Sequence, residues 1–141
     1  MSRKDIIALL DRRRDAFARR DAAASAVLYA ETCVLISPTA GGTVTGRAAI
    51  EQVYQAWFKA FPDVVFISEE VLIEDDRVVE IGITAGTDTG GFMGLMPTAK
   101  PFRLPIVFLS TVRDREIVHE RRIYDFTGML VQIGVLKAKP A

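Results

Sequence analysis

The apolar residues of this chain change their period at Pro62, and this change limits the fold more than any single motif. Before Pro62 they recur every three or four positions, as along one face of an α-helix. After it, four long segments are rich in apolar residues at the spacing of strands. Helices followed by strands predict an α+β domain, in which the helices pack on one face of an antiparallel sheet.

The part of the chain before Pro62 is expected to hold three helices and one short strand. A Ser2–Asp5 pair is typical of a capping box at the start of a helix, and Asp21 can cap the next helix. Three consecutive arginines, residues 12–14, are expected to lie on the solvent side of the first helix. The expected elements are a first helix with Ile6, Leu9, Leu10 and Phe17 on its apolar face, a helix over residues 22–30, a strand over 33–37, a loop over 39–46 and a helix over 47–60.

The part after Pro62 is expected to form a curved antiparallel sheet. Its strands are expected over residues 64–74, 77–88, 102–113 and 116–126, with a longer loop over 89–101. Short turns join the first pair and the last pair, and long antiparallel strands twist strongly. If such a sheet curls around the helices, the interior tapers like a cone. We therefore expect a cavity that is lined mainly by apolar side chains and has room for a six-carbon ring.

Composition and charge exclude several classes of function. The 141 residues fit one domain, residues 1–141, and half of them are hydrophobic. Eighteen basic residues balance eighteen acidic ones, so no attraction to nucleic acid or to a membrane surface is expected. One histidine and one cysteine do not make a usual metal site, and no phosphate loop is present, so no cofactor is expected.

The expected compartment follows from Cys33 and from the first residues of the chain. A single cysteine allows no disulfide within the chain, which fits a reducing compartment, and Cys33 is expected to be buried and inert. The N-terminal residues lack the apolar stretch of a signal peptide. We therefore expect a cytoplasmic protein.

Short strings along the chain, each weak alone, occur in an order and spacing that is specific in combination. They are Thr45-Gly46-Arg47 with Ile50, Phe61-Pro62-Asp63, Gly86 to Gly90, Phe92-Met93-Gly94 with Pro97-Thr98, Ile117 with Glu120, and Tyr124-Asp125 followed by Leu130, Gln132, Ile133, Gly134 and Val135. In these strings the chain resembles the SnoaL-like polyketide cyclase family, part of the nuclear transport factor 2 and ketosteroid isomerase superfamily. The resemblance implies a cone-shaped α+β barrel that encloses a pocket, usually as a homodimer or tetramer.

The residues that perform aldol cyclisation in that family are replaced here. In the aldol cyclases a general-base aspartate takes the position of Arg122, a histidine that of Phe108 and a glutamine that of Ile106. The resemblance therefore implies the fold, whereas the aldol chemistry is not supported. Because the superfamily also holds isomerases, hydrolases and non-enzymatic binding proteins, the fold does not settle the function.

Glu120, Arg122 and Asp125 are the candidate catalytic residues. Glu120 and Arg122 are two positions apart on an expected strand, so they face the same side. The resemblance implies that this is the pocket side, which places Ile117 and His119 on the outer side. The alternatives are an exposed Glu120–Arg122 pair on the outer face and an Asp125 that caps the following helical turn.

A proton-transfer reaction needs a base and a donor that holds the enolate oxygen. We expect Glu120 or Asp125 as the base, since burial in an apolar pocket can raise the pKa of a carboxyl group. Arg122 or Tyr29 is the expected donor. The candidates for ligand binding are Tyr29, Trp57, Phe92, Met93 and Phe108, for which the alternative is a place in the ordinary core.

Two functions of different classes remain. The first is a cofactor-free cyclase or isomerase that moves a proton in a small apolar carbonyl compound. The second is a non-catalytic protein of the same fold that binds a small ligand or a partner. An unfilled cavity that Glu120 and Arg122 face favours the enzyme, whereas an interior filled by Phe108 and Trp57 favours the binding protein.

A homodimer is expected through the outer face of the sheet. The chain has enough helix to cover only one face of that sheet. The strand over residues 102–113 carries apolar residues on both sides, with Leu104, Ile106 and Phe108 on one and Pro105, Val107 and Leu109 on the other.

Overall fold

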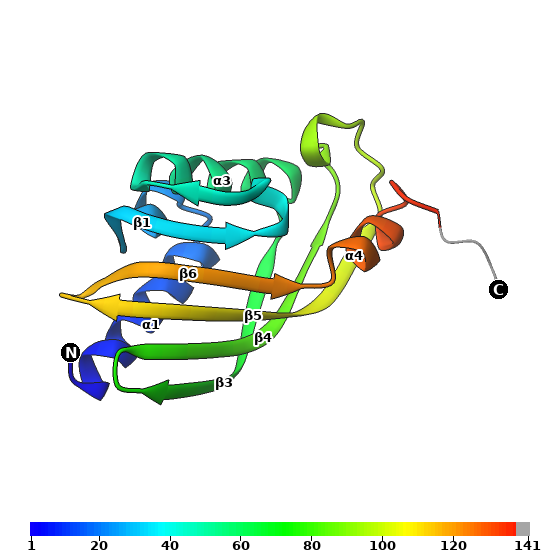
Figure 1. The fold of residues 1–141 in the computed structure, drawn as a ribbon. Coiled ribbons are helices and arrows are strands. Elements are labelled where there is room, and N and C mark those ends of the chain that lie inside the picture. Colours follow the sequence, from blue (N-terminus) through cyan, green and yellow to red (C-terminus); the bar gives the residue numbers. More distant parts are fainter. Residues whose placement is uncertain (138–141) are drawn as a thin grey trace.

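Helices packed against one six-stranded sheet make up residues 1–137, the part of the chain that the computed structural model describes (Figure 1). The elements are α1 (Arg3–Ala18), α2 (Ala22–Ala26), β1 (Tyr29–Ser37), the 3-10 turn η1 (Pro38–Ala40), β2 (Gly42–Thr45), α3 (Arg47–Ala60), β3 (Val65–Glu74), β4 (Arg77–Thr87), the 3-10 turn η2 (Phe92–Gly94), β5 (Pro101–Arg113), β6 (Glu116–Tyr124) and α4 (Phe126–Gln132). The expected α+β class is confirmed.

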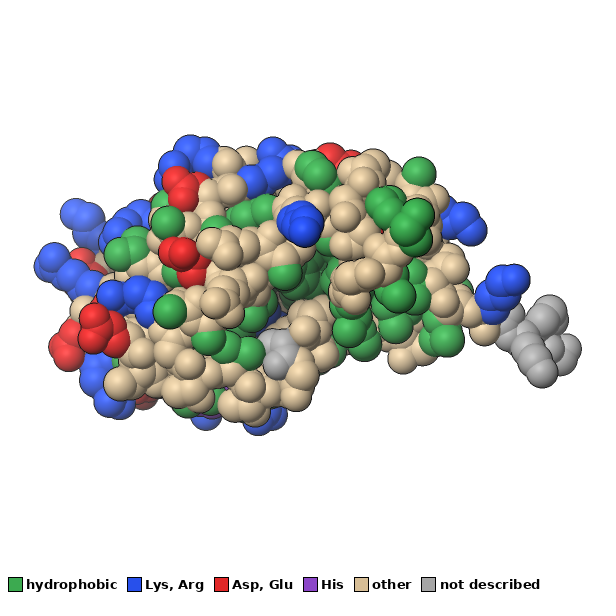
Figure 2. All heavy atoms as spheres, turned by 90° about the horizontal axis from the view of Figure 1, so that it is seen from above, with side chains coloured by type: hydrophobic (Ala, Val, Ile, Leu, Met, Phe, Trp, Pro, Cys, Tyr) green, Lys and Arg blue, Asp and Glu red, His purple; other side chains and the backbone are tan. Residues whose placement is uncertain are grey.

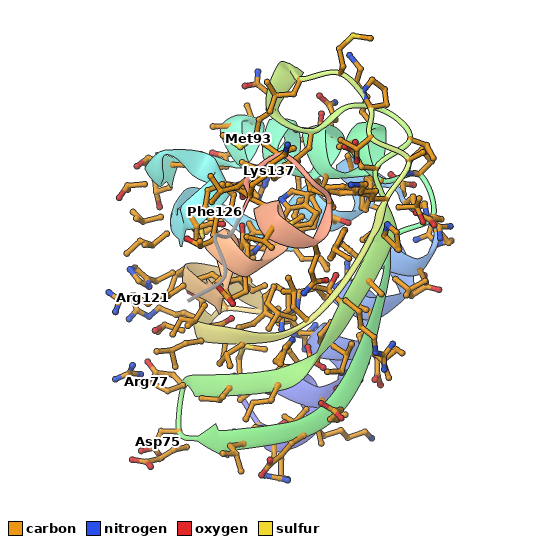
Figure 3. All side chains as sticks on the ribbon, turned by 90° about the vertical axis from the view of Figure 1, so that its right-hand side faces the viewer. Asp75, Arg77, Met93, Arg121, Phe126 and Lys137 are labelled. Atoms are coloured by element: carbon orange, nitrogen blue, oxygen red, sulfur yellow. The ribbon has the colours of Figure 1, made fainter. Side chains whose placement is uncertain are left out.

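The sheet has the strand order β2-β1-β6-β5-β4-β3 and is strongly curved (Figure 3). All neighbouring strands are antiparallel except β1 and β6, which run parallel. The four strands after Pro62 pair antiparallel as expected, and the sheet is mixed because β1, from the part before Pro62, joins β6. The long connection between these two strands lets the chain return in the same direction, which a short turn does not allow. The sheet is also open, because β2 and β3 are its edges.

The N-terminal helices begin where the sequence predicts, but the second one ends early. The Ser2 hydroxyl accepts a hydrogen bond from the Asp5 amide at 3.0 Å, and Asp21 accepts one from the Ala24 amide at 2.9 Å. Helix α2 ends at Ala26 instead of residue 30, so Tyr29 lies in β1. The carbonyl of Leu28 accepts a hydrogen bond from the amide of Ile117 in β6. This bond continues the sheet where a longer helix was expected.

Strand β6 contains a bulge that decides which side chains face the helices. Thr111 of β5 pairs with His119, but the next residue of β5 pairs with Ile117, so one residue of β6 is extra. Glu120 and Arg122 therefore lie on the concave side, as predicted. Ile117 lies there too, fully buried, and its expected outward position is wrong because the bulge changes the parity before Glu120.

Two clusters fill the space between the helices and the sheet. The first lies under α1 and includes Leu10, Leu35 and Ile117. The second lies under the C-terminal end of α3 and includes Trp57, Phe61 and Phe102, with α4 closing it at the end of β6 (Figure 1). The cavity described below lies between α1, α3 and the sheet. Among the described residues, no helix has both the length and the apolar character needed to cross a bilayer.

Candidate functional site

A small cavity lies between α1, α3 and the concave face of the sheet. Its lining residues are Arg13, Arg14, Phe17, Ser37, Tyr54, Trp57, Phe66, Thr84, Ile106, Phe108, Arg122 and Tyr124. The free volume is about 40 Å³. A cavity that holds benzene measures about 150 Å³. The expected room for a six-carbon ring is therefore not present in this state, because aromatic side chains, Phe108 and Trp57 among them, fill the interior.

Arg13 is at the centre of the polar end of this cavity, although the sequence suggested a solvent-exposed side chain. It is only 5% exposed. Its Nη2 donates to Oε1 of Glu80 at 2.9 Å, and its Nη1 donates to Oε1 of Glu120 and to the Ser110 hydroxyl. The expectation is wrong because Arg13 continues the buried stripe of α1, seven positions after Ile6, where the helix meets two inward carboxylates.

Glu120 is fully buried, and both oxygens of its carboxylate accept hydrogen bonds from neighbouring side chains. Besides Arg13, it accepts hydrogen bonds from the Tyr29 hydroxyl at 2.7 Å, from Ser110 at 2.9 Å and from Nε of Arg122 at 3.0 Å. Burial alone would raise the pKa of Glu120, but the two guanidinium charges and these hydrogen bonds hold that pKa below its ordinary value. Glu120 is therefore an ionised partner of arginines and is poorly suited to take a proton from carbon.

Arg122, like Arg13, borders the cavity next to its aromatic walls. Its Nε and Nη2 donate to Glu120 and to the Tyr29 hydroxyl, at 3.0 and 3.1 Å. Its Cζ lies 4.8 Å from the ring centre of Tyr54 and 5.4 Å from that of Phe108. Among the described residues, no group accepts a hydrogen bond from Nη1. Arg122 can therefore still donate to a ligand oxygen.

The charged groups around the cavity are unevenly placed. Arg13, Arg14 and Arg122 border it, whereas the buried carboxylates are those of Glu80 and Glu120. Asp11, which pairs with Arg14, compensates from the solvent side, where its side chain is 63% exposed. Arg13 and Arg122, the two buried arginines, are balanced by Glu80 and Glu120, but of the charged residues that the structure describes only arginines border the cavity, which favours an anion there.

Tyr29 and Tyr54 both contact this network, and Tyr54 also borders the cavity. Their hydroxyls are 2.7 Å apart, and the hydroxyl of Tyr29 also contacts Glu120 and Arg122. Burial raises the pKa of both phenols. Tyr29 is fully buried and does not border the cavity, so its expected role as a ligand-binding residue becomes one of holding Arg122 in place.

The other predicted ligand-binding residues are divided between two places. Trp57 and Phe108 border the cavity. Phe92 and Met93 instead border an outer hollow over α3, and the Met93 side chain is 60% exposed. That hollow is visible in Figure 2, with hydrophobic side chains on its walls. The turn η2 places Phe92 and Met93 on the side of Trp57 that faces away from the cavity. The position of this turn could not be inferred from the sequence.

Asp125 has the capping role that was its alternative. Its carboxylate accepts a hydrogen bond from the Gly128 amide at 2.8 Å, at the start of α4. It is not among the residues that border the cavity. His119 and Arg121 lie on the other side of β6 from Glu120, and Figure 3 shows Arg121 pointing away from the molecule.

Sequence reasoning missed Arg13 and Glu80, and a signal for each was present. The position of Arg13 in the sequence places it on the apolar face of α1, and Glu80 lies two positions after Val78, on the same face of β4. A charged side chain at a buried position of a helix or strand needs a partner of opposite charge. Two such positions of opposite sign, Arg13 and Glu80, predict an internal ion pair.

Comparisons with known proteins agree with the fold. The sequence model of the SnoaL-like polyketide cyclases matches residues 8–133. The chain is 30% identical to IdmH from Streptomyces antibioticus, a candidate polyketide cyclase, with a TM-score of 0.76 over 89% of this chain and 96% of that one. Among curated proteins no match was found.

Two more distant solved structures share the fold and hold small molecules. One is a protein of ketosteroid isomerase-like fold from Catenulispora acidiphila in complex with trimethylamine, 20% identical, with a TM-score of 0.78 over 94% of this chain and 97% of that one. The other is TerC, co-crystallised with polyporic acid, 18% identical, with a TM-score of 0.76 over 92% of this chain and 98% of that one.

Proposed function

The chain belongs to the SnoaL-like polyketide cyclase family, and we propose that it binds a small aromatic carbonyl compound in an anionic form, with the charged oxygen at Arg122. The observation that carries this proposal is the position of the Arg122 guanidinium, which is held by Glu120 and Tyr29, lies over aromatic rings and retains a free Nη1. The ligand is an enolate, a phenolate or a carboxylate.

Charge and shape both support an anionic aromatic ligand. The three arginines that border the cavity favour an anion and disfavour a cation such as trimethylammonium. Aromatic walls, among them Phe66 and Phe108, suit a planar ring. Polyporic acid, the compound crystallised with TerC, is itself an acid. In this reading Glu120 positions Arg122 and does not act as a base.

Proton transfer from carbon lacks a base at this site. The residues that border the cavity include three arginines but no aspartate, glutamate or histidine. The nearest carboxylates, Glu80 and Glu120, are committed to arginines. A cyclase or isomerase at this site would therefore act by polarising a carbonyl oxygen at Arg122, as preorganised donors do. The filled interior and the missing base favour ligand binding over base catalysis.

A comparison of two probes of equal shape tests this proposal. The carboxylate of 2-naphthoate can bind Arg122, whereas 2-naphthamide offers the same rings without the charge. Isothermal titration calorimetry of the wild type should show 2-naphthoate binding more tightly by about tenfold or more, as charged hydrogen bonds give.

The matched variants are Arg122→Gln and Arg121→Gln, since the two arginines are adjacent on β6 and point to opposite sides. The preference for 2-naphthoate should disappear in Arg122→Gln and persist in Arg121→Gln. Equal affinity of the two probes for the wild type would refute an anion site. A preference that survives in Arg122→Gln and is lost in Arg121→Gln would place the binding site on the outer side of the sheet.

A further inference from the structure

The turn that contains Thr39 lies between the cavity and two outer hollows. The hollow over α3, of about 530 Å³, is bordered by Thr39 and shares Trp57 with the cavity. A second hollow, of about 400 Å³, lies at the ends of β1 and β6 and shares Ser37, Arg122 and Tyr124 with the cavity. The turn that contains Thr39 therefore stands where a ligand could pass from either hollow into the interior.

The Thr39 hydroxyl contacts three of the residues that border the cavity. It accepts hydrogen bonds from the Tyr124 hydroxyl at 3.0 Å and from Nε1 of Trp57 at 3.4 Å, and it lies 3.2 Å from the Ser37 hydroxyl. A hydroxyl has one donor and two acceptor sites. With both acceptor sites used, Thr39 must donate to Ser37, so this one group is fully engaged and links β1, α3 and β6.

The chain just after Thr39 borders open space. The pairing of β1 with β6 ends at Ile36 and Arg121, so the two strands separate just before the turn. Gly41 and Gly42 follow with φ angles of 69° and 104°, a left-handed region, and nothing lies within 4 Å of the position of a Cβ on either. The segment from Pro38 to Gly42, called the 38–42 turn below, therefore borders open space at its two glycines.

We infer that Thr39 controls access to the cavity by holding the 38–42 turn closed against Trp57 and Tyr124. This inference rests on the proposed function for its purpose, since it concerns how a ligand reaches the same site. A cavity of about 40 Å³ cannot admit an aromatic ring without opening. The contacts that must break are neutral hydrogen bonds of a single side chain, whereas the ion network behind Arg122 can stay intact.

The test uses Trp57 itself, because it is the only tryptophan of the chain and needs no ligand. Acrylamide, a small neutral quencher, reports how often the indole becomes accessible. In the wild type Trp57 is 9% exposed, so quenching should be weak. Thr39→Val removes the hydroxyl and keeps the shape, and it should raise the quenching constant about twofold or more because the turn opens more often. Thr39→Ser, which keeps the hydroxyl, should resemble the wild type.

Thr43→Val is the matched control, since Thr43 is exposed on neighbouring β2. It should leave quenching unchanged. Tyr124→Phe removes the hydroxyl that donates to Thr39 and should also raise the quenching constant. This variant tests the inference if Thr39→Val does not fold. Quenching that is equal in the wild type, Thr39→Val and Tyr124→Phe would overturn the inference. Because no probe ligand is present, this failure is distinct from a failure of anion binding at Arg122.

Discussion

Arg13 and Glu120 meet in the interior, with Nη1 2.5 Å from Oε1, although 107 positions separate them in the chain. Arg13 also binds Glu80, so one side chain of α1 joins β4 and β6. Both Arg13 and Glu120 are buried, and their charges can be tolerated there only as a pair. The same contacts that attach the helix to the sheet also fix the position of Arg122 at the cavity.

The first prediction is that Glu120→Gln destabilises the protein by about 3–5 kcal/mol, because Arg13 and Arg122 then lose a buried negative partner. His119→Ala, one position away on the other side of β6, should cost less than about 1 kcal/mol. Urea unfolding at pH 7 measures both. Equal and small effects would show that Glu120 is solvated, and a large effect at His119 alone would reverse the two faces of the strand.

The second prediction concerns the pH dependence of stability. The pKa of Glu120 is lowered in the folded protein relative to the value of about 4.3 in an unfolded chain. As the pH falls, the unfolded state therefore takes up a proton first, and the stability that Glu120 contributes is lost between that value and its lower folded-state pKa. The difference in unfolding free energy between the wild type and Glu120→Gln should be constant above about pH 5 and shrink below about pH 4. A difference that grows on acidification would contradict this sign.

The third prediction is that Cys33 is unreactive in the folded protein. Burial raises the pKa of its thiol to about 12, and the nearby charge of Glu120 acts in the same direction. Because the thiolate is the reactive form, Ellman's reagent at pH 8 should label Cys33 only as fast as the protein unfolds. Addition of denaturant should make labelling rapid. Labelling within seconds in buffer alone would show that β1 opens locally.

The fold class, the helices and the four long strands could be predicted from the sequence, since amphipathic period and turn residues are local signals. Strand β2 could not, and its residues were expected in a loop over 39–46. The parallel pairing of β1 with β6 could not, because it depends on where the chain returns after 79 further residues, from Ser37 to Glu116. The bulge before Glu120 was equally invisible, since an extra residue in β6 shows only against its partner strand. For this reason the alternation of side chains along a strand predicted the side of β6 on which Glu120 lies, but predicted the wrong side for Ile117.

The candidate site was predicted in part. Glu120 and Arg122 do face the cavity side, and Trp57 and Phe108 do border it. Their chemistry was not predictable, because the pKa of Glu120 depends on Arg13, which reaches it from a helix. A run of three arginines suggests a solvated face, and only the helical position of Arg13 distinguishes it from its neighbours.

The fourth prediction is a homodimer through the outer face of the sheet. Apolar side chains form rows across the strands there, with Ile67 opposite Ile83 and Val107 opposite Ile123. Ile67 and Ile123 are about half exposed, at 49% and 51%. A contiguous apolar face of this kind favours association. Sedimentation velocity at micromolar concentration should show a dimer.

The matched variants for this prediction are Val107→Lys, in the centre of the outer face, and Ile7→Lys, on α1. Ile7 is 40% exposed and lies in the helical layer. Val107→Lys should yield a folded monomer, whereas Ile7→Lys should leave the dimer intact. A wild-type protein that sediments as a monomer, or a dimer broken by Ile7→Lys alone, would contradict the proposed interface.

The central claim is that an anionic aromatic ligand lies inside the cavity with its charge at Arg122. A crystal structure with 6-bromo-2-naphthoate tests this most directly, because the anomalous signal of bromine fixes the direction of the ring. The account predicts a carboxylate oxygen at about 3 Å from Nη1 of Arg122, with the bromine directed toward Trp57 and the 38–42 turn. A ligand that lies in the hollow over α3, or one whose bromine is next to Arg122, would contradict the account.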